Sequence, residues 1–400
     1  MFIKHMNWRD STISGDALRV NRKATHEDTR YQNRRFVLQC LFTNAPTTRA
    51  DISRATGLTR ATVSDLVAEL VDEGVVLEMG TAPSGGGKPP TLLTISDDSH
   101  HLVAVRLDGS RWKGSVLSLR HRVIESVTVE SAGRRGAPAI DALNDLVERL
   151  LGSTRQQVLG IGIATPGVVT VDGTVIEATD LDWHGIDVGR LVRERFSVPT
   201  HVVNDARAIA LAEYSLGGHG TNNLFVVKIG TGIGAGIILD GRPYAGEGDA
   251  AGEIGHMAVL SAISDGDSVT ALEDVASARA LSVRLGIDEP GNLDATSVFR
   301  EVARRVAAGD GDALRIVELA GRYVGIVMAS VTGILDIHHI VVSGPMTQVG
   351  AAFLNPAREE LSRRVLPAVE SRVEISFGTV DRPEEHGAAM LVLSREMGIL

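Results

Sequence analysis

The chain has 400 residues, of which 44% are hydrophobic and 22% are charged, and its formal net charge is −10. A chain of this length exceeds what one hydrophobic core usually serves, so we expect two or three domains. No apolar run is long enough to span a membrane and no leader-like segment opens the chain, which predicts a soluble, cytoplasmic protein without a membrane partner. The single cysteine, Cys40, excludes a disulfide framework and a cysteine-based zinc cluster.

The charge is distributed unevenly along the chain. Residues 1–60 hold 11 Lys+Arg and 5 Asp+Glu, a local charge of +6, so the remaining 340 residues carry −16. A basic segment on an acidic body suits an anionic polymer that binds at one end, although a solvated charged face would have the same composition. Residues 1–30 lack an apolar period and are predicted to be a mobile arm.

An amphipathic helix is predicted after this arm, from Arg34 to Phe42. Two further helices are predicted to follow it. Thr47 to Ile52 opens the first of them, Gly57 ends it, and Thr59 caps the second. In the second helix the apolar residues form one stripe and leave small polar and basic side chains on the opposite face of the first turns. The apolar positions are Val63, Leu66, Val67 and Leu70. This layout is typical of a helix-turn-helix unit that binds DNA.

A wing follows the two helices. Residues 75–78 and 91–95 are predicted strands around a glycine-rich loop whose Lys88 could reach phosphate or the minor groove. Such helix pairs also occur in ordinary helical domains, but the wing and the basic segment favour double-stranded operator DNA as a partner. The residues expected to contact DNA are Arg49, Thr59, Arg60, Thr62, Ser64 and Lys88.

After a short polar joint at 96–100, strands and helices recur in a similar order twice. This predicts two related α/β lobes with a cleft between them. Strands are expected at 101–107, 113–119, 123–129, 158–164, 200–203 and 340–343, and helices at 139–151, 206–216, 271–286, 295–307, 311–335 and 353–364.

A glycine-rich turn lies between the predicted strands 224–229 and 237–239. The cluster Gly230 to Gly236 can aim several backbone N–H groups at one anion, so Gly230, Thr231, Gly232 and Gly234 are predicted to bind phosphate. Glu253 and His256 follow, one helical turn apart. The segment predicts a cleft for a nucleotide, a hydroxyl-rich small molecule, or both; a plain glycine-rich hairpin is the alternative.

Four motifs in this order resemble the ROK family. They are Ile161 to Gly167 (Ile-Gly-Ile-Ala-Thr-Pro-Gly), Asn204-Asp205-Ala206, Gly230 to Gly236, and Gly252-Glu253-Ile254-Gly255-His256. The resemblance covers residues 31–395 and implies an α/β fold: an N-terminal winged helix-turn-helix domain (31–96) and a two-lobed, actin-like sugar-kinase domain (97–400). The family includes sugar kinases without the DNA-binding domain and transcriptional repressors with it, such as those of xylose and N-acetylglucosamine genes.

The resemblance also implies a sugar site. Its residues would be Asp180, Asn204, Asp205, Glu253, His256 and Glu273. Asp205 stands where the kinases keep their base, and a carboxylate at the end of a buried strand can accept a proton from a sugar hydroxyl. Asp180 replaces the usual Asn, which changes a donor and acceptor into an acceptor only.

Two departures from the family pattern argue against a kinase. Where kinases read Asp-x-Gly-Gly-Thr, this chain has Arg106-Leu107-Asp108-Gly109-Ser110. Arg106 replaces a carboxylate that manages the metal and phosphates, and Asp108 places negative charge beside a triphosphate, so we expect ATP turnover to be lost or very weak and no cofactor. Residues 261–267 lack the cysteines that hold zinc in the family, so no metal is expected and His256 is a hydroxyl ligand or a core histidine.

These observations predict a sugar-responsive transcriptional regulator, in the form of a repressor that a sugar or sugar phosphate releases from DNA. A homodimer or homotetramer is expected because one winged helix makes few contacts with a specific site. Two alternatives stay open: a sugar kinase that carries a DNA-binding domain, and a DNA-binding protein that responds to a partner protein instead of a sugar.

Overall fold

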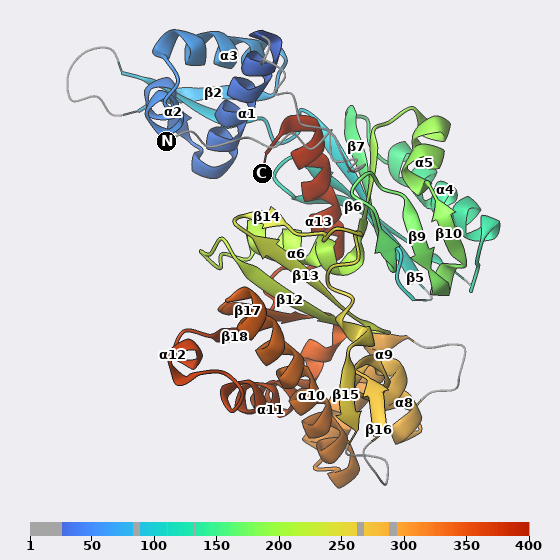
Figure 1. Ribbon diagram of the computed structural model, residues 1–400. Coiled ribbons are helices and arrows are strands. Elements are labelled where there is room, and N and C mark those ends of the chain that lie inside the picture. The colour runs from blue at the N-terminus through green and yellow to red at the C-terminus, as the bar shows by residue number, and fades with distance from the viewer. Residues whose placement is uncertain are drawn as a thin grey trace, which may run out of the picture.

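The computed structural model describes residues 26–82, 89–109, 111–131, 133–261, 268–287 and 294–399. The chain forms a winged helix and two α/β lobes, with the winged helix at the top of Figure 1 and the second lobe at the bottom. No helix in the described part of the chain is long and apolar enough to cross a membrane.

The winged helix has the predicted helices and sheet. Its elements are α1 (His26–Asn44), β1 (Thr47–Thr48), α2 (Arg49–Thr56), α3 (Arg60–Asp72), β2 (Val76–Thr81) and β3 (Thr91–Ile95), with strand order β1-β3-β2. Thr48 and Asp51 form a capping box at α2, Gly57 ends it with a φ of 71°, and Thr59 caps α3. These caps satisfy backbone groups that the helix ends leave unpaired, which confirms the predicted helix boundaries.

The predicted C-terminal boundary of the arm, at residue 30, is wrong. Residues 26–30 belong to α1, which begins well before Arg34. Ion pairs between the first turns of α1 and the far half of α3, from Arg30 to Glu69 and from Arg34 to Glu73, accompany this extension. Tertiary contacts therefore outweigh the polar local sequence. The rest of the arm lies outside the described residues.

The first lobe is built on a five-stranded sheet of order β11-β7-β4-β5-β6. The strands β4 (His101–Arg106), β5 (Arg111–Ser118) and β6 (Val123–Glu130) form the predicted antiparallel meander, and β7 (Val158–Thr165) and β11 (Thr200–Asn204) add parallel strands. The helices α4 (Ala137–Gly152) and α5 (Val188–Phe196) contribute to the hydrophobic core at this sheet. A small sheet of β8 (Val168–Val169), β9 (Val175–Ala178) and β10 (Trp183–Ile186) adjoins it, with η1 (Thr179–Leu181) between β9 and β10.

The second lobe repeats this topology, as the sequence predicted. Its sheet has the order β14-β13-β12-β17-β18, with an antiparallel meander of β12, β13 and β14 and two parallel strands, β17 and β18. The strands are β12 (Leu224–Ile229), β13 (Ile233–Leu239), β14 (Arg242–Pro243), β17 (His339–Ser343) and β18 (Glu374–Phe377). The remaining elements are η2 (Ile254–His256), β15 (Ala258–Ser261), β16 (Ser268–Ala271), α7 (Glu273–Ala276), α8 (Ala278–Leu285), α9 (Ala295–Ala307), α10 (Gly311–Leu335), η3 (Pro345–Val349), α11 (Ala351–Ser362) and α12 (Pro367–Glu370).

The glycine cluster is not one long turn, which corrects the sequence prediction. Only Gly230 to Gly232 turn the chain, and β13 already begins at Ile233. Gly236 is a strand residue that packs against α6 (Asp205–Leu216): a β-carbon there would lie 3.1 Å from the carbonyl carbon of Ala206. Part of the glycine pattern therefore serves close packing between strand and helix.

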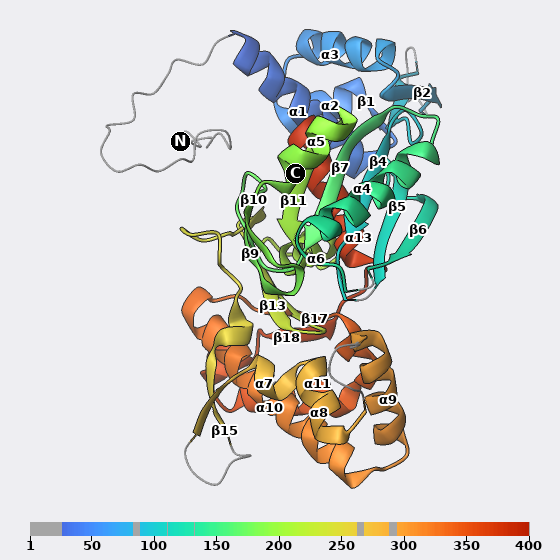
Figure 2. The ribbon, with the colours of Figure 1, turned by 90° about the vertical axis from the view of Figure 1, so that its right-hand side faces the viewer.

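Two helices lie between the sheets, as both views show (Figures 1 and 2). These are α6 and α13 (Pro383–Val392), and the chain ends after α13 in the π-helix η4 (Leu393–Met397). A β-carbon at Gly387 would lie 2.8 Å from Ala208 Cα, so only a glycine lets α6 and α13 approach this closely. Since α13 also contributes side chains to a core that includes the winged helix, it touches both α6 and the DNA-binding domain.

Candidate functional site

The predicted base position lies at the boundary between a strand and a helix. Asn204 ends β11 and caps α6: its Oδ1 accepts a hydrogen bond from the Arg207 N–H at 3.0 Å, and its Nδ2 donates to the Gly167 carbonyl at 2.9 Å. Asp205 follows as the first residue of α6 and is 6% exposed. The strand end and the cap together aim Asp205 out of the sheet edge where the two lobes meet.

Asp205 is paired with a buried lysine that the sequence analysis did not single out. Lys228 Nζ donates to Asp205 Oδ2, while Asp205 Oδ1 accepts a hydrogen bond from the Ala206 N–H at 2.7 Å. Burial favours the neutral amine, but Asp205, Asp108 and Glu384 outweigh it and raise the pKa of Lys228 above its usual range. The site therefore contains a fixed positive charge.

Carboxylates from the second lobe lie on the other side of this pair. Glu273 Oε2 accepts a hydrogen bond from the Ile233 N–H at 3.0 Å, at the end of the glycine turn. Burial, with smaller contributions from Asp205 and Glu273, raises the pKa of Glu253. His256 and Arg207 oppose that shift, so five charged or polar groups are close enough to influence one another. Apart from Arg207, all were predicted sugar-site residues.

Two glycines make room for Glu273. A β-carbon at Gly232 would lie 2.7 Å from its Oε2, and one at Gly255 would lie 3.0 Å from the same oxygen. Glu273 thus occupies the space beside the turn, and the Ile233 N–H is directed at a carboxylate rather than at an open anion site. Of the residues predicted to bind phosphate, Gly230, Thr231 and Gly232 lie in the turn, whereas Gly234 lies in β13.

Asp180, the sixth predicted sugar residue, lies at the rim. It is in η1 of the first lobe, its side chain is 59% exposed, and its Oδ1 lies 3.6 Å from Arg279 Nη2 of α8 in the second lobe. A second ion pair joins the lobes at 3.1 Å, from Arg111 of β5 to Asp294 before α9. Asp180 therefore pairs with a cation from the opposite lobe in an exposed contact.

Arg106, in the stretch that the sequence analysis interpreted as an altered phosphate loop, faces α13. Arg106 Nη1 lies 3.6 Å from Glu384 Oε1, and Glu384 is 4% exposed. Burial favours the neutral form of Arg106, but Glu384, Asp108 and Glu385 outweigh it and raise the pKa of Arg106. Arg106 is thus a structural cation that anchors the start of α13.

Three functional candidates were missed by sequence reasoning: Lys228, Arg207 and Arg279. A signal existed for Lys228 only, because it is the single charged residue in the apolar strand Leu-Phe-Val-Val-Lys-Ile. Arg207 is 7% exposed and interacts with Asp249, Glu253 and Asp205, but helical spacing alone does not say that it faces them.

The DNA-binding candidates divide into exposed and structural residues. Arg60 and Ser64 are exposed on the first turns of α3. Thr59 Oγ1 caps the helix by accepting from the Thr62 N–H at 3.2 Å and lies 2.9 Å from Thr62 Oγ1. Arg49 pairs with Glu78 of β2 at 2.9 Å. Lys88 lies outside the described residues.

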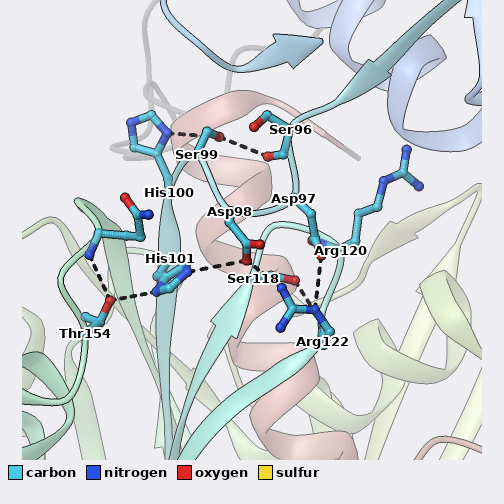
Figure 3. Close-up of polar contacts among 11 residues, drawn as sticks. Ser96, Asp97, Asp98, Ser99, His100, His101, Ser118, Arg120, Arg122 and Thr154 are labelled. Carbon is cyan, nitrogen blue, oxygen red and sulfur yellow. Dashed lines mark hydrogen bonds and ion pairs between the residues drawn. The ribbon is translucent and has the colours of Figure 1, made fainter. Parts of the chain in front are cut away.

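The joint between the winged helix and the first lobe is held by ion pairs and hydrogen bonds (Figure 3). Arg122 Nη2 lies 2.5 Å from Asp98 Oδ1 and its Nε 3.3 Å from Asp97 Oδ2, and the Arg120 N–H donates to Asp97 Oδ1 at 3.0 Å. His101 Nδ1 lies 2.7 Å from Thr154 Oγ1 at the start of β4. The predicted polar joint is therefore fastened to the turn between β5 and β6.

The same turn contacts α1 and α13. His121 Nδ1 lies 3.2 Å from His386 Nδ1 of α13, and its ring meets Phe42 of α1 edge-on at a centroid distance of 6.5 Å. Burial, then His386, lowers the pKa of His121 to about 3, so the ring is neutral near pH 7. The turn from Leu119 to Arg122 thus connects the joint, the winged helix and α13.

Known proteins share this combination of parts. Residues 102–395 match the ROK family, and residues 32–76 match a winged helix-turn-helix DNA-binding family. The chain belongs to the ROK family. This confirms the family and the fold class expected from the four motifs. The two lobes together form the sugar-kinase-like domain of this family.

ROK relatives include both regulators and kinases. The xylose repressor of Caldicellulosiruptor bescii is 28% identical over 382 residues, which cover 90% of this chain and 95% of the repressor. A ROK family transcriptional regulator, a homologue of the Escherichia coli MLC protein, has a crystal structure with a TM-score of 0.79 at 21% identity, covering 93% of this chain and 98% of that one. A ROK family glucokinase from Streptomyces griseus, solved with glucose and AMPPNP, has a TM-score of 0.61 at 23% identity and covers 73% of this chain and 98% of the kinase. The regulators therefore match more of the chain than the kinase does.

Proposed function

We propose that this protein is a sugar-responsive DNA-binding regulator, acting as a repressor of carbohydrate uptake or metabolism genes that a sugar or sugar phosphate releases from DNA. The observation that carries the proposal is the shared hydrophobic core. Buried residues of α1, α3 and β3 pack in one cluster with β4, β5, α6 and α13, so the DNA-binding domain and the lobe with Asp205 are one packed unit. The xylose repressor relative, matched along almost its whole length, supports the same function.

A contiguous path runs from the sugar site to the winged helix. Asp205 begins α6, α6 packs on α13 through Gly387, and His386 of α13 contacts His121, which meets Phe42 of α1. A sugar that binds the closed form of the lobes more tightly than the open form would move α6 and α13 together. Because packed elements shift as units, the winged helices would then no longer fit two half-sites at once.

We infer further that the protein does not phosphorylate its sugar. Phosphoryl transfer depends on positioned charge, and here Arg106 pairs with Glu384 while Lys228 pairs with Asp205. The ion pair with Lys228 already engages one oxygen of Asp205, which opposes the role of a base. ADP release that depends on the sugar would contradict this inference and favour the kinase alternative.

We also infer a homodimer or homotetramer. One α3 presents only a few exposed side chains to DNA, so a specific site needs paired copies. Sedimentation of the purified protein with and without operator DNA measures this directly. A monomer bound to a single half-site with full affinity would contradict it.

The test of the proposed function is fluorescence anisotropy of the full chain on its own upstream DNA at fixed salt. D-xylose, D-glucose, N-acetyl-D-glucosamine and their phosphates are titrated in. We expect one of them to release the DNA, and Asp205→Asn to abolish the release while DNA binding persists. Asp141→Asn, a change of an exposed residue on α4, is the matched control and should behave as wild type. If no sugar alters DNA binding, the proposal fails and a protein partner becomes the candidate signal.

A further inference from the structure

Lys228 is a buried lysine next to Asp205, a predicted sugar-site residue. It stands in β12, in which all six residues are buried, and its own exposure is 6%. The side chain runs beneath the glycine turn, because a β-carbon at Gly230 would lie 3.6 Å from Lys228 Cε. The ammonium group therefore lies inside the protein, close to the predicted phosphate loop, instead of reaching for solvent.

The ammonium group is surrounded by carboxylates from three separate segments of the chain. It donates to Asp205 at the start of α6, and Asp108 and Glu384 add to the negative field around it. Arg106 neutralises part of that field through its ion pair with Glu384. Since burying an unpaired charge is costly, Lys228 and Asp205 stabilise each other here.

Enzymes that transfer phosphoryl groups bind a divalent cation where carboxylates converge in this way. Mg²⁺ usually binds through one or two carboxylates together with the phosphates of its nucleotide. In the described residues no group of three or more His, Cys, Asp or Glu side chains is arranged to hold a metal ion. The charge that a metal would supply is supplied by Lys228, and a second cation beside it would be repelled.

We propose that Lys228 determines what the cleft binds: its ammonium group takes the place of a divalent cation, so that the cleft accepts a hydroxyl-rich sugar without metal or nucleotide. The sugar part rests on the proposed function. Asp205 keeps lone pairs free for a sugar hydroxyl, because each of its oxygens accepts only one hydrogen bond from the protein in the contacts described. Lys228 acts as a positioning residue that fixes Asp205 as an acceptor.

The first experiment measures binding of Mn²⁺, a spectroscopic substitute for Mg²⁺, by the loss of its free electron paramagnetic resonance signal. Wild type and Lys228→Arg should leave Mn²⁺ free, because both keep a cation beside Asp205. Lys228→Met should bind Mn²⁺ at least tenfold more tightly, and adding Asp205→Asn should remove the gain. Lys113→Met, at an exposed position of β5, is the matched control. Equal Mn²⁺ affinity in Lys228→Met and wild type would overturn the proposal.

A second measurement uses wild type alone, in case Lys228→Met does not fold by circular dichroism. The thermal midpoint should not move with Mg²⁺, with EDTA or with Mg²⁺ and AMPPNP together. A stabilising shift by Mg²⁺ and AMPPNP would show a nucleotide site and overturn the proposal. Neither measurement uses sugar or DNA, so a chain that no sugar releases from DNA would refute the proposed function and leave these results standing.

Discussion

The contact between α6 and α13 can be tested with a single added methyl group. Gly387→Ala would place a β-carbon 2.8 Å from Ala208 Cα and closer still to its carbonyl group. Non-bonded carbons need about 3.5 Å or more, so the two helices must move apart by about 1 Å. Overpacking of this kind costs about 3 kcal/mol, and the better helix propensity of alanine returns about 1 kcal/mol. We expect a net loss of about 2 kcal/mol in the free energy of unfolding.

The assay is urea unfolding followed by circular dichroism, with Gly333→Ala as the control. Gly333 is also a helical glycine, in α10, but a β-carbon there meets nothing within 4 Å. This variant should gain up to about 1 kcal/mol from helix propensity. The two variants should therefore differ by about 3 kcal/mol, although both make the same chemical change.

The same variant tests the proposed path to the DNA. With α6 and α13 displaced, Gly387→Ala should still bind DNA at the winged helix but should need more sugar for release, which anisotropy measures. If Gly387→Ala is as stable as Gly333→Ala, the close approach of the helices is refuted. If it is unstable but responds to sugar as wild type does, the path through α13 is refuted.

Three further predictions concern the winged helix and its junction. Arg60 is expected to contact a DNA phosphate, so Arg60→Ala should weaken binding to all DNA sequences and reduce the slope of log affinity against log salt concentration by about 1. An unchanged slope and affinity would show that Arg60 does not contact DNA. Thr48→Ala should lower the free energy of unfolding by about 1 kcal/mol because the capping box of α2 is lost, and a neutral result in urea titration would contradict that role. Because the pKa of His121 is lowered in the folded chain, only the unfolded chain takes up a proton on this ring just below about pH 6.5. The free energy of unfolding should therefore fall by up to about 1.4 kcal/mol per pH unit as the pH drops from 6 toward 4. His121→Asn tolerates the left-handed backbone there (φ 63°) and should flatten this slope in urea titrations at several pH values; equal slopes would contradict the assignment.

The junction shows where sequence reasoning stops. The polar segment at 96–100 was predicted as a joint, and its local composition was sufficient for that. That Asp97 and Asp98 meet Arg122, and that His121 meets His386, depends on residues that are distant in the chain. No local pattern encodes such pairings, because the turn between β5 and β6 brings Arg122 to the joint and the packing of α13 brings His386 to His121.

The sugar site shows the same division. Asn204, Asp205, Glu253 and His256 stand in the motifs that carry the family resemblance, and Glu273 was predicted from the resemblance alone. Whether these residues bind a sugar is still a prediction. Their motifs could be recognised because each combines a strand end or a glycine turn with polar residues at short spacing. The role of Glu273 beside the Ile233 N–H, and the contact of Asp180 with Arg279 across the cleft, follow from the arrangement of the lobes.

The sequence by itself determined the order of elements, the caps of α2 and α3, the repeated lobe topology and the family, because these depend on local periodicity, turn chemistry and short motifs. The tertiary structure alone decided the extension of α1, the packing role of Gly236, and the pairing of Lys228 with Asp205. Each of these depends on contacts between distant segments: the start of α1 gains an ion pair to α3, Gly236 packs against α6, and a buried charge must find its partner wherever the fold places one.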